Sequence, residues 1–334
     1  MRICYLHLGM PKTGSTSIQE AFRGFETSDL AMAGRNMANH GQMLCCEFSE
    51  SPQKLSFFWQ RNLRGKQREA AITHQRALLK KALAGRKSLI FSSEGLTDKL
   101  NSREIGAMFR GLGEHFDKIV PIIYVRPAAS LAASQFQQRV KTGLGEFRLP
   151  PPDYRARFEP VLQSAEDGAT VFVKFTRDSL VRGDAVSDFA HRVGLATAPA
   201  APAQENESLS AEAVASLYAF NKYTGPIYSP FRFRKMRLRL IKRLSSIGTL
   251  KFGFAPDLIK QQMTDLADEI AWAERATGLD LSAPPEPAAH PIGSEDDLLA
   301  LAEDMVRERI RGAGGGVPRS PNQKAHHQKR LPRP

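Results

Sequence analysis

The sequence predicts an α/β protein, a parallel sheet with helices on both of its faces. Four short β-rich runs alternate with helical patterns over roughly the first two thirds of the 334 residues. One of these runs, KIVPIIYV, is almost continuously apolar, as strands buried on both faces are. A helix between successive strands makes neighbouring strands parallel, so these two observations favour a layered α/β fold.

Apolar spacing and end signals define the elements. The first strand, residues 2–9, ends at Gly9, and Ile18 and Phe22 lie four residues apart on the helix that follows. Residues 24–62 show no clear period. Further strands are expected at 88–95, 118–127 and 169–175, and further helices at 66–85, 103–116, 129–143, 154–165, 183–195, 209–223, 255–278 and 294–312. Gly85 is expected to cap the helix before it.

The chain is expected to form one domain over residues 1–311. A basic helical insertion is expected at about 226–256, and residues 312–334 read as a disordered basic tail. These two segments hold eight and five Lys or Arg residues and no acid, which accounts for the whole formal charge of +12. The other 34 basic and 35 acidic residues nearly cancel. This distribution argues against a protein coated with nucleic-acid-binding charge.

Three cysteines, Cys4, Cys45 and Cys46, lack metal-ligand spacing and are expected to be small buried thiols. No apolar run reaches about 18 residues, so no spanning helix is expected. The first apolar run is too short for a signal peptide, and a cytoplasmic location is therefore expected.

The stretch YLHLGMPKTGSTSIQEAF is close to a phosphate-binding loop. Gly9, Gly14 and Thr16 fit the ATP-binding pattern G-x-x-x-x-G-K-[ST], but Ser15 stands where that pattern has lysine. The one lysine, Lys12, comes before Gly14. A loop between a first strand and a first helix presents backbone N–H groups to an anion. An ordinary Gly- and Ser-rich turn is the alternative.

The run PKTGSTS resembles the phosphosulfate-binding loop of sulfotransferases that use 3′-phosphoadenosine 5′-phosphosulfate (PAPS). The resemblance implies a P-loop-like fold and a co-substrate, PAPS, that needs no metal. It also implies that Lys12 stabilises the bridging oxygen as sulfate leaves. The implied cofactor-binding residues in this loop are Pro11, Lys12, Thr13, Gly14, Ser15, Thr16 and Ser17.

A second pair of residues extends the resemblance. The family binds the 3′-phosphate with an Arg at a strand end and a Ser eight residues later, and YVRPAASLAAS places Arg126 and Ser134 at that spacing. Arginine can hold a phosphate through two hydrogen bonds. The segments at 171–195 and 206–217 also look like bacterial members of the family, so the likeness spans most of residues 3–280.

Two positions depart from the family. The aromatic residue that helps to stack adenine in cytosolic members is Ser17 here, and their late R-K-G run is missing, with Arg234 and Lys235 as a weak substitute. The adenine pocket therefore has no assigned residues.

Transfer to an alcohol needs a base opposite the leaving group. Glu94 ends the buried run LIFSSEG, where doubly wound folds bind ligands, and carbohydrate-type relatives use a Glu in this role. Ser92 or Ser93 could contact the sulfuryl group or the base. Glu94 could instead start a helix or form an ion pair. His7 and His115 are the competing bases, although His7 lies within a strand and reads as a core histidine.

The basic segment at 226–256 has an apolar stripe of Phe233, Met236, Leu240, Leu244 and Ile247 among its arginines. It could rest on an anionic membrane, grip an acidic glycan or pack on the core. The resemblance favours a carbohydrate, glycolipid or polysaccharide precursor as acceptor, and nucleic acid is disfavoured. A kinase using ATP and Mg²⁺, or an inactive nucleotide fold that binds a membrane or polyanion, are the alternatives.

Overall fold

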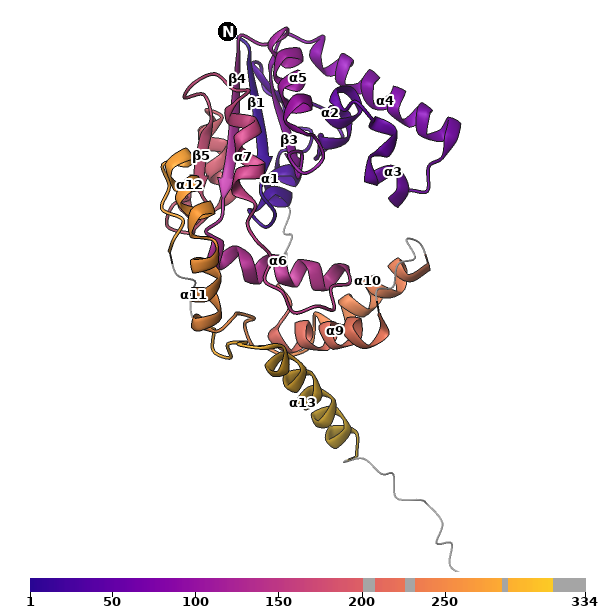
Figure 1. The fold of residues 1–334 in the computed structure, drawn as a ribbon. Coiled ribbons are helices and arrows are strands. Elements are labelled where there is room, and N and C mark those ends of the chain that lie inside the picture. Colours follow the sequence, from indigo (N-terminus) through magenta and orange to yellow (C-terminus); the bar gives the residue numbers. More distant parts are fainter. Residues whose placement is uncertain (201–207, 226–231, 284–287, 315–334) are drawn as a thin grey trace, which may run out of the picture.

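The computed structural model describes residues 1–200, 208–225, 232–283 and 288–314, with backbone alone at 232–234 and 308–314. Its centre is a sheet of five parallel strands in the order β2-β3-β1-β4-β5 (Figure 1). The strands are β1 (Ile3–Gly9), β2 (Leu30–Met32), β3 (Ser88–Glu94), β4 (Lys118–Val125) and β5 (Val171–Lys174). With helices on both faces, this sheet confirms the predicted α/β fold.

The helices fall into two groups. Those packed around the sheet are α1 (Ser15–Ala21), α2 (Gly41–Phe48), α3 (Ser56–Gln60), α4 (Gly65–Leu83), α5 (Ser102–Gly113), α7 (Tyr154–Leu162), α8 (Ala185–Arg192) and α12 (Ala267–Thr277). Those beyond its carboxyl edge are α6 (Ala128–Thr142), α9 (Ala211–Thr224), α10 (Arg232–Leu244), α11 (Pro256–Asp265) and α13 (Glu295–Gly314). Single 3-10 turns lie at Pro52–Lys54 and Val181–Gly183.

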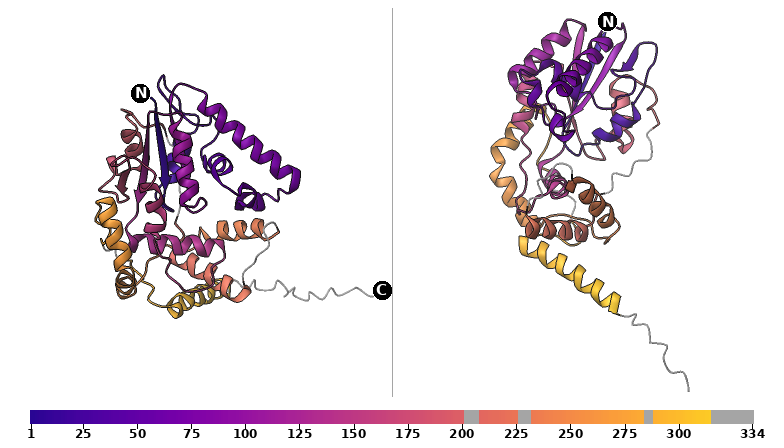
Figure 2. Two further views of the ribbon diagram at one scale, coloured as in Figure 1. Left: turned by 45° about the horizontal axis from the view of Figure 1, so that its top comes forward. Right: turned by 90° about the vertical axis from the view of Figure 1, so that its right-hand side faces the viewer.

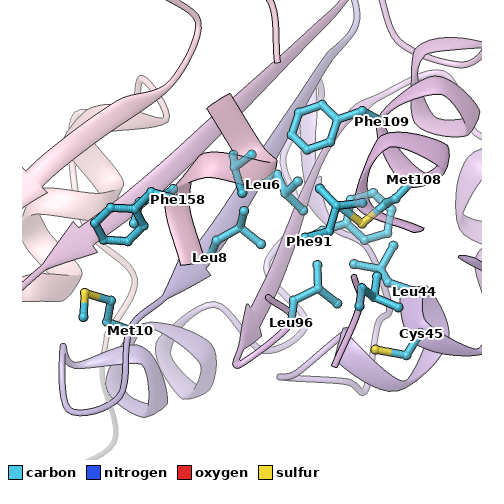
Figure 3. Close-up of a cluster of buried hydrophobic side chains, with 14 of the residues drawn as sticks. Leu6, Leu8, Met10, Leu44, Cys45, Phe91, Leu96, Met108, Phe109 and Phe158 are labelled. Carbon is cyan, nitrogen blue, oxygen red and sulfur yellow. The ribbon is translucent and has the colours of Figure 1, made fainter. Parts of the chain in front are cut away.

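Each face of the sheet has its own apolar core. On one face, Leu6, Leu8 and Phe91 pack with Leu44 of α2 and Met108 of α5 (Figure 3). On the other, side chains of α1 and α8 cover the sheet. All three cysteines are buried and unpaired, as the sequence predicts. Burial raises the pKa of each thiol, which fits small apolar side chains in a core.

A third core lies outside the sheet. Helix α6 leaves the carboxyl end of β4 and runs beneath that edge, where α9, α10, α11 and α13 gather with it (Figures 1 and 2). Phe136 of α6 stacks on Phe252 at 5.7 Å between ring centroids. The carboxyl edge of the sheet is therefore followed by a helical layer, and α6 joins the two.

The structure differs from the expected elements in four places. Strand β2 lies in the segment that showed no period. The helix expected at 255–278 is broken at Leu266 because its first half packs on the third core and its second half on the first. Helix α4 ends at a cap on Ala84 rather than Gly85. Helix α13 continues to Gly314, and the rest of the expected tail lies outside the described residues.

No helix in the described ranges is long and apolar enough to cross a membrane.

Candidate active site

The loop from Met10 to Gly14 joins β1 to α1 and takes two left-handed turns. Lys12 has a φ of 65° and Gly14 one of 73°. A left-handed lysine is strained, so the surrounding contacts must hold it. One of these contacts lies inside the loop, where the Thr13 hydroxyl donates to the carbonyl of Met10 at 2.7 Å. The loop is therefore a defined turn that includes Lys12.

Arg126 connects this loop to β4, the strand beside β1 in the sheet. It follows the last residue of β4, and its guanidinium donates to the Lys12 carbonyl oxygen at 2.9 Å and to the Ser130 hydroxyl at 3.2 Å. The backbone of Arg126 is held in turn by Tyr154, whose hydroxyl donates to its carbonyl at 2.6 Å. Two residues 114 positions apart in the sequence thus meet at one point.

Those two bonds leave donors of Arg126 for a ligand. A guanidinium has five N–H donors, and within the described residues the side chain makes only these two hydrogen bonds. The side chain is partly buried, and this loss of solvent lowers its pKa, although the group stays charged. A partly buried cation without an acidic partner in the described part of the chain is suited to an anionic ligand.

Glu94 lies on the other side of the loop. The β1–β3 register pairs Gly9 with Glu94, so the carboxylate leaves the sheet beside the start of the loop. The chain continues from β1 towards β2 and from β4 towards β5, in opposite directions across the sheet. The carboxyl ends of β1 and β4 therefore form the topological switch point, where open α/β sheets bind ligands. Lys12, Glu94 and Arg126 therefore lie at the same edge of the sheet.

The pKa of Glu94 is raised above its ordinary value, chiefly because the carboxyl is mostly removed from water. The charges of Lys12 and Lys99 oppose this rise, whereas Asp98 adds to it. A carboxylate with a raised pKa is a stronger base than one in water. The charge of Lys12 therefore acts on Glu94, so this carboxyl lies near the cation of the loop.

Ser134 lies on α6, half-buried and two turns from Arg126. No hydrogen bond joins the two in the described residues. Ser130, which has no distinguishing signal in the sequence, contacts the arginine instead. It lies in the first turn of α6, and its hydroxyl also donates to the carbonyl of Pro127 at 3.1 Å. Ser130 therefore fixes the orientation of Arg126, whereas Ser134 remains a candidate ligand residue further along the helix.

Lys141 is a second residue that the sequence did not reveal. It lies in the last turn of α6, and its pKa is lowered by partial burial and then by the charge of Lys12. A pair of mutually repelling lysines at one edge is costly unless an anion binds between or beside them. The carboxyl edge is thus bordered by cations from both the loop and the helical layer.

Beneath the loop is a buried polar network without net charge. His7 Nδ1 lies 2.8 Å from the Ser92 hydroxyl, which also accepts a bond from the Gln19 amide at 3.1 Å. The backbone N–H of Ser92 donates to Nδ1 of His40 at 3.0 Å. Burial lowers the pKa of His7 to about 3 and that of His40 to about 4, so both rings are neutral at pH 7.

This network defines the roles of His7 and Ser92. His7 is a core histidine, as expected, and is not placed as a base. Ser92 supports the histidines and does not reach the loop surface, since it is fully buried. His115 is exposed, and its carbonyl accepts from Arg2 at the amino end of the sheet, so it is far from the site.

The hydroxyls of the loop point in different directions. Thr13 is engaged with Met10, Thr16 is exposed, and Ser17 is half-buried. The Ser15 hydroxyl is buried, has no hydrogen-bond partner among the described residues, and lies 2.0 Å from where a β-carbon on Gly9 would be. A buried donor without a partner is expensive. An unpaired Ser15 hydroxyl and partly buried cations fit a phosphate-bearing ligand at this loop.

Comparison with known proteins adds one distant likeness. No family model matches the chain, and no curated protein matches it. Among solved structures, the chain is similar to a sulfotransferase domain from the curacin biosynthetic pathway, with 13% identity, a TM-score of 0.33, and an alignment over 80% of this chain and 97% of that domain. At these values the fold and the site rest on the geometry of the chain itself.

Proposed function

We propose that this protein is a PAPS-dependent sulfotransferase whose acceptor is a hydroxyl of a carbohydrate, glycolipid or polysaccharide precursor. The observation that carries the proposal is the hydrogen bond from Arg126 to the carbonyl of Lys12. It joins the two segments that resemble the 5′- and 3′-phosphate sites of the family. Either segment alone has ordinary explanations, whereas their contact at the topological switch point supports a ligand with phosphates at both positions.

The co-substrate supplies an activated sulfuryl group on a phosphate leaving group. The backbone and hydroxyls of the loop, residues 11–17, hold its 5′ end, and Arg126 with Ser134 holds its 3′-phosphate. Lys12 neutralises the charge that develops on the bridging oxygen, which is the role of a cation aimed at a developing anion.

Glu94 is proposed as the general base. It accepts the proton of the acceptor hydroxyl as that oxygen forms a bond to sulfur, and the bond from sulfur to the bridging oxygen breaks. The electron pair of that bond leaves with the product, 3′-phosphoadenosine 5′-phosphate. The raised pKa of Glu94 supports this role, because a stronger base draws the proton more effectively. The nearby positive charge of Lys12 opposes the rise in the pKa of Glu94 and so favours the ionised carboxylate.

Thermal unfolding with three ligands tests the proposal. The product 3′-phosphoadenosine 5′-phosphate at a hundred times its dissociation constant should stabilise the protein by about 2.7 kcal/mol. PAPS should act similarly. The variants Lys12→Ala and Arg126→Ala should lose most of this stabilisation, whereas Arg86→Ala, an exposed arginine after α4, should keep it.

ATP with Mg²⁺ is the arm that examines the kinase alternative. Sulfotransferase function predicts little stabilisation by it, since Lys12 lies before Gly14 and not after it. Absence of stabilisation by the bisphosphate, or stabilisation that survives in both loop and Arg126 variants, would refute the proposal. Strong stabilisation by ATP–Mg²⁺ alone would favour the kinase, and no response to any nucleotide would favour a binding protein. A cytoplasmic site of action remains a prediction.

A further inference from the structure

Helix α10 carries a dense positive charge with a separate apolar side. Its thirteen residues, RFRKMRLRLIKRL, include seven Lys or Arg and no acid. Leu240, Ile241 and Leu244 pack against the core beyond the sheet. Met236, expected in that stripe, is instead 44% exposed, and Ile241 occupies the inner side.

The opposite side of the helix faces solvent. Positions i, i+4, i+7 and i+8 fall within one face of an α-helix. We call this surface the α10 basic face, and its members are Lys235, Arg239, Lys242 and Arg243. All four are exposed, and in the described part of the chain none forms an ion pair. Along the helix axis they extend over about 12 Å. This length suits a polymer with several anionic groups better than one small anion.

The same helix is tied to the candidate active site. Arg237 donates to the Lys141 carbonyl at 2.5 Å, to the Val140 carbonyl, and to the Asn221 side chain at 2.9 Å. Asn221 in turn donates to the carbonyls of Val140 and Leu144, so α9 and α10 together cap the end of α6. Lys141, in that same turn, is the residue whose pKa responds to Lys12.

A membrane fits this helix less well. Helices that lie in a membrane interface insert their apolar side, and here that side is used in packing. Among the apolar side chains of α10 that the structure describes, only Met236 and Leu238 are exposed, one on each flank of the basic face. Nucleic acid fits poorly as well, because no aromatic side chain is available for base stacking between residues 235 and 244.

We propose that the acceptor is an acidic polysaccharide and that the α10 basic face binds its anionic groups while a hydroxyl further along the polymer enters the site at Lys12 and Glu94. The entry of a hydroxyl at Lys12 and Glu94 rests on the proposed sulfotransferase function. Binding by the α10 basic face stands on the charge of the helix alone, and the two can be tested separately.

The test measures binding of the full-length protein to a fluorescent short heparin oligosaccharide, by anisotropy and without nucleotide. The test variant changes all four residues of the α10 basic face to Gln. The matched control changes Arg64, Lys66, Lys80 and Lys81 to Gln, four exposed cations at and on α4 with an equal loss of charge. We expect the α10 variant to bind heparin on the order of tenfold or more weakly, since each exposed contact is worth up to about a factor of five. The α4 control should bind within about twofold of the unmodified protein.

Three results would overturn the proposal. The first is equal loss in the two variants, which would mean a nonspecific response to net charge. The second is binding of neutral dextran as tightly as heparin. The third is that vesicles of phosphatidylcholine and phosphatidylglycerol in equal parts, or a single-stranded oligonucleotide, bind more tightly than heparin and lose that binding in the α10 variant.

Stabilisation by 3′-phosphoadenosine 5′-phosphate, measured on the same α10 variant, separates this inference from the proposed function. If the unmodified protein is not stabilised by the nucleotide but binds heparin through α10, the sulfotransferase proposal is refuted and the binding role of the α10 basic face is supported. If the α10 variant keeps both nucleotide stabilisation and heparin binding, the binding role of the α10 basic face is refuted and the sulfotransferase proposal is supported.

Discussion

The carboxyl edge of the sheet has two layers that differ in charge. The buried layer beneath the loop is neutral and consists of His7, Gln19, His40 and Ser92. The charged rim above it consists of Lys12, Glu94, Arg126 and Lys141. Hydrogen bonds between uncharged groups hold the lower layer together, whereas the rim has strong charges that are only partly compensated by one another.

The difference separates the groups that hold this edge together from the groups that could bind a ligand. Neutral hydrogen-bonded groups can be buried at modest cost, so they fix β1, β3 and the helix that follows the loop. Charges that must respond to a ligand lie where an anion or a proton can reach them. The separation also keeps the histidines from titrating with the base, so that activity and stability should depend on pH through different groups.

Removing the proposed base should have the largest effect. Glu94→Gln keeps the size of the side chain and loses its ability to take a proton, so transfer should fall by about 10²–10⁴-fold in kcat. Stabilisation by 3′-phosphoadenosine 5′-phosphate should be retained. The matched control is Glu114→Gln, an exposed acid after α5. Full activity in Glu94→Gln would show that the rim does not contain the base.

The buried layer predicts acid sensitivity of the fold. In the folded protein the pKa of His7 is lowered to about 3 and that of His40 to about 4. The unfolded chain therefore binds more protons below about pH 6.5, and the free energy of unfolding should fall as pH decreases from there. Between about pH 7 and about pH 5 each histidine should cost about 2 kcal/mol, measurable by urea denaturation.

Single substitutions divide that slope. His40→Gln should remove about half of it, because one of the two neutral rings is gone. His74→Gln, at an exposed position of α4, should leave it unchanged. A free energy of unfolding that stays constant over this range in the unmodified protein would mean that the two rings are not held neutral.

A side chain at Gly9 should disturb the boundary between the two layers. A β-carbon there would lie 2.0 Å from the Ser15 hydroxyl and 3.6 Å from Nε2 of His7. Gly9→Ala should therefore cost about 1–3 kcal/mol in unfolding free energy and weaken nucleotide binding, because the loop must shift. Gly113→Ala is the control, since nothing lies within 4 Å of its added carbon. Equal stability and equal nucleotide affinity in the two variants would contradict the packing described for Ser15.

The smallest effect should come from charges around the base. Lys99 lowers the pKa of Glu94 and Asp98 raises it. In the proposed mechanism transfer requires the ionised carboxylate, so activity should be lost as pH falls through the pKa of Glu94. Lys99→Gln should move this acidic limb to higher pH and Asp98→Asn to lower pH, each by a few tenths of a unit. Shifts in the same direction would mean that the acidic limb of the pH–activity profile does not report the titration of Glu94.

Local signals were sufficient for much of this molecule. The apolar runs predict four of the five strands, and the loop and Arg126 were found because each is a short pattern at a strand end. Strand β2 has only three residues, so it leaves no period to detect. The break at Leu266 arises because two cores compete for one helical stretch, which is a tertiary effect.

The residues missed at the site share a cause. Ser130 and Lys141 are ordinary helical residues. Their places at the site come from contacts with Arg126 and Arg237 and from the charge of Lys12, which only the fold brings near. Spacing alone places Met236 in the packed stripe, because it does not determine which side of α10 meets the core. One domain over residues 1–311 also remains a prediction, since the chain has separate apolar cores joined by α6.

Calorimetric titration of 3′-phosphoadenosine 5′-phosphate and of adenosine 5′-phosphate into the unmodified protein, Arg126→Gln and Lys12→Gln tests the central claim most directly. If Arg126 recognises the 3′-phosphate beside the loop, the unmodified protein should prefer the bisphosphate by about a hundredfold, as expected for a charge-assisted pair. Arg126→Gln should remove most of that preference, and Lys12→Gln should weaken both ligands alike. An equal affinity for the two nucleotides in the unmodified protein, or a preference that survives in Arg126→Gln, would contradict the account.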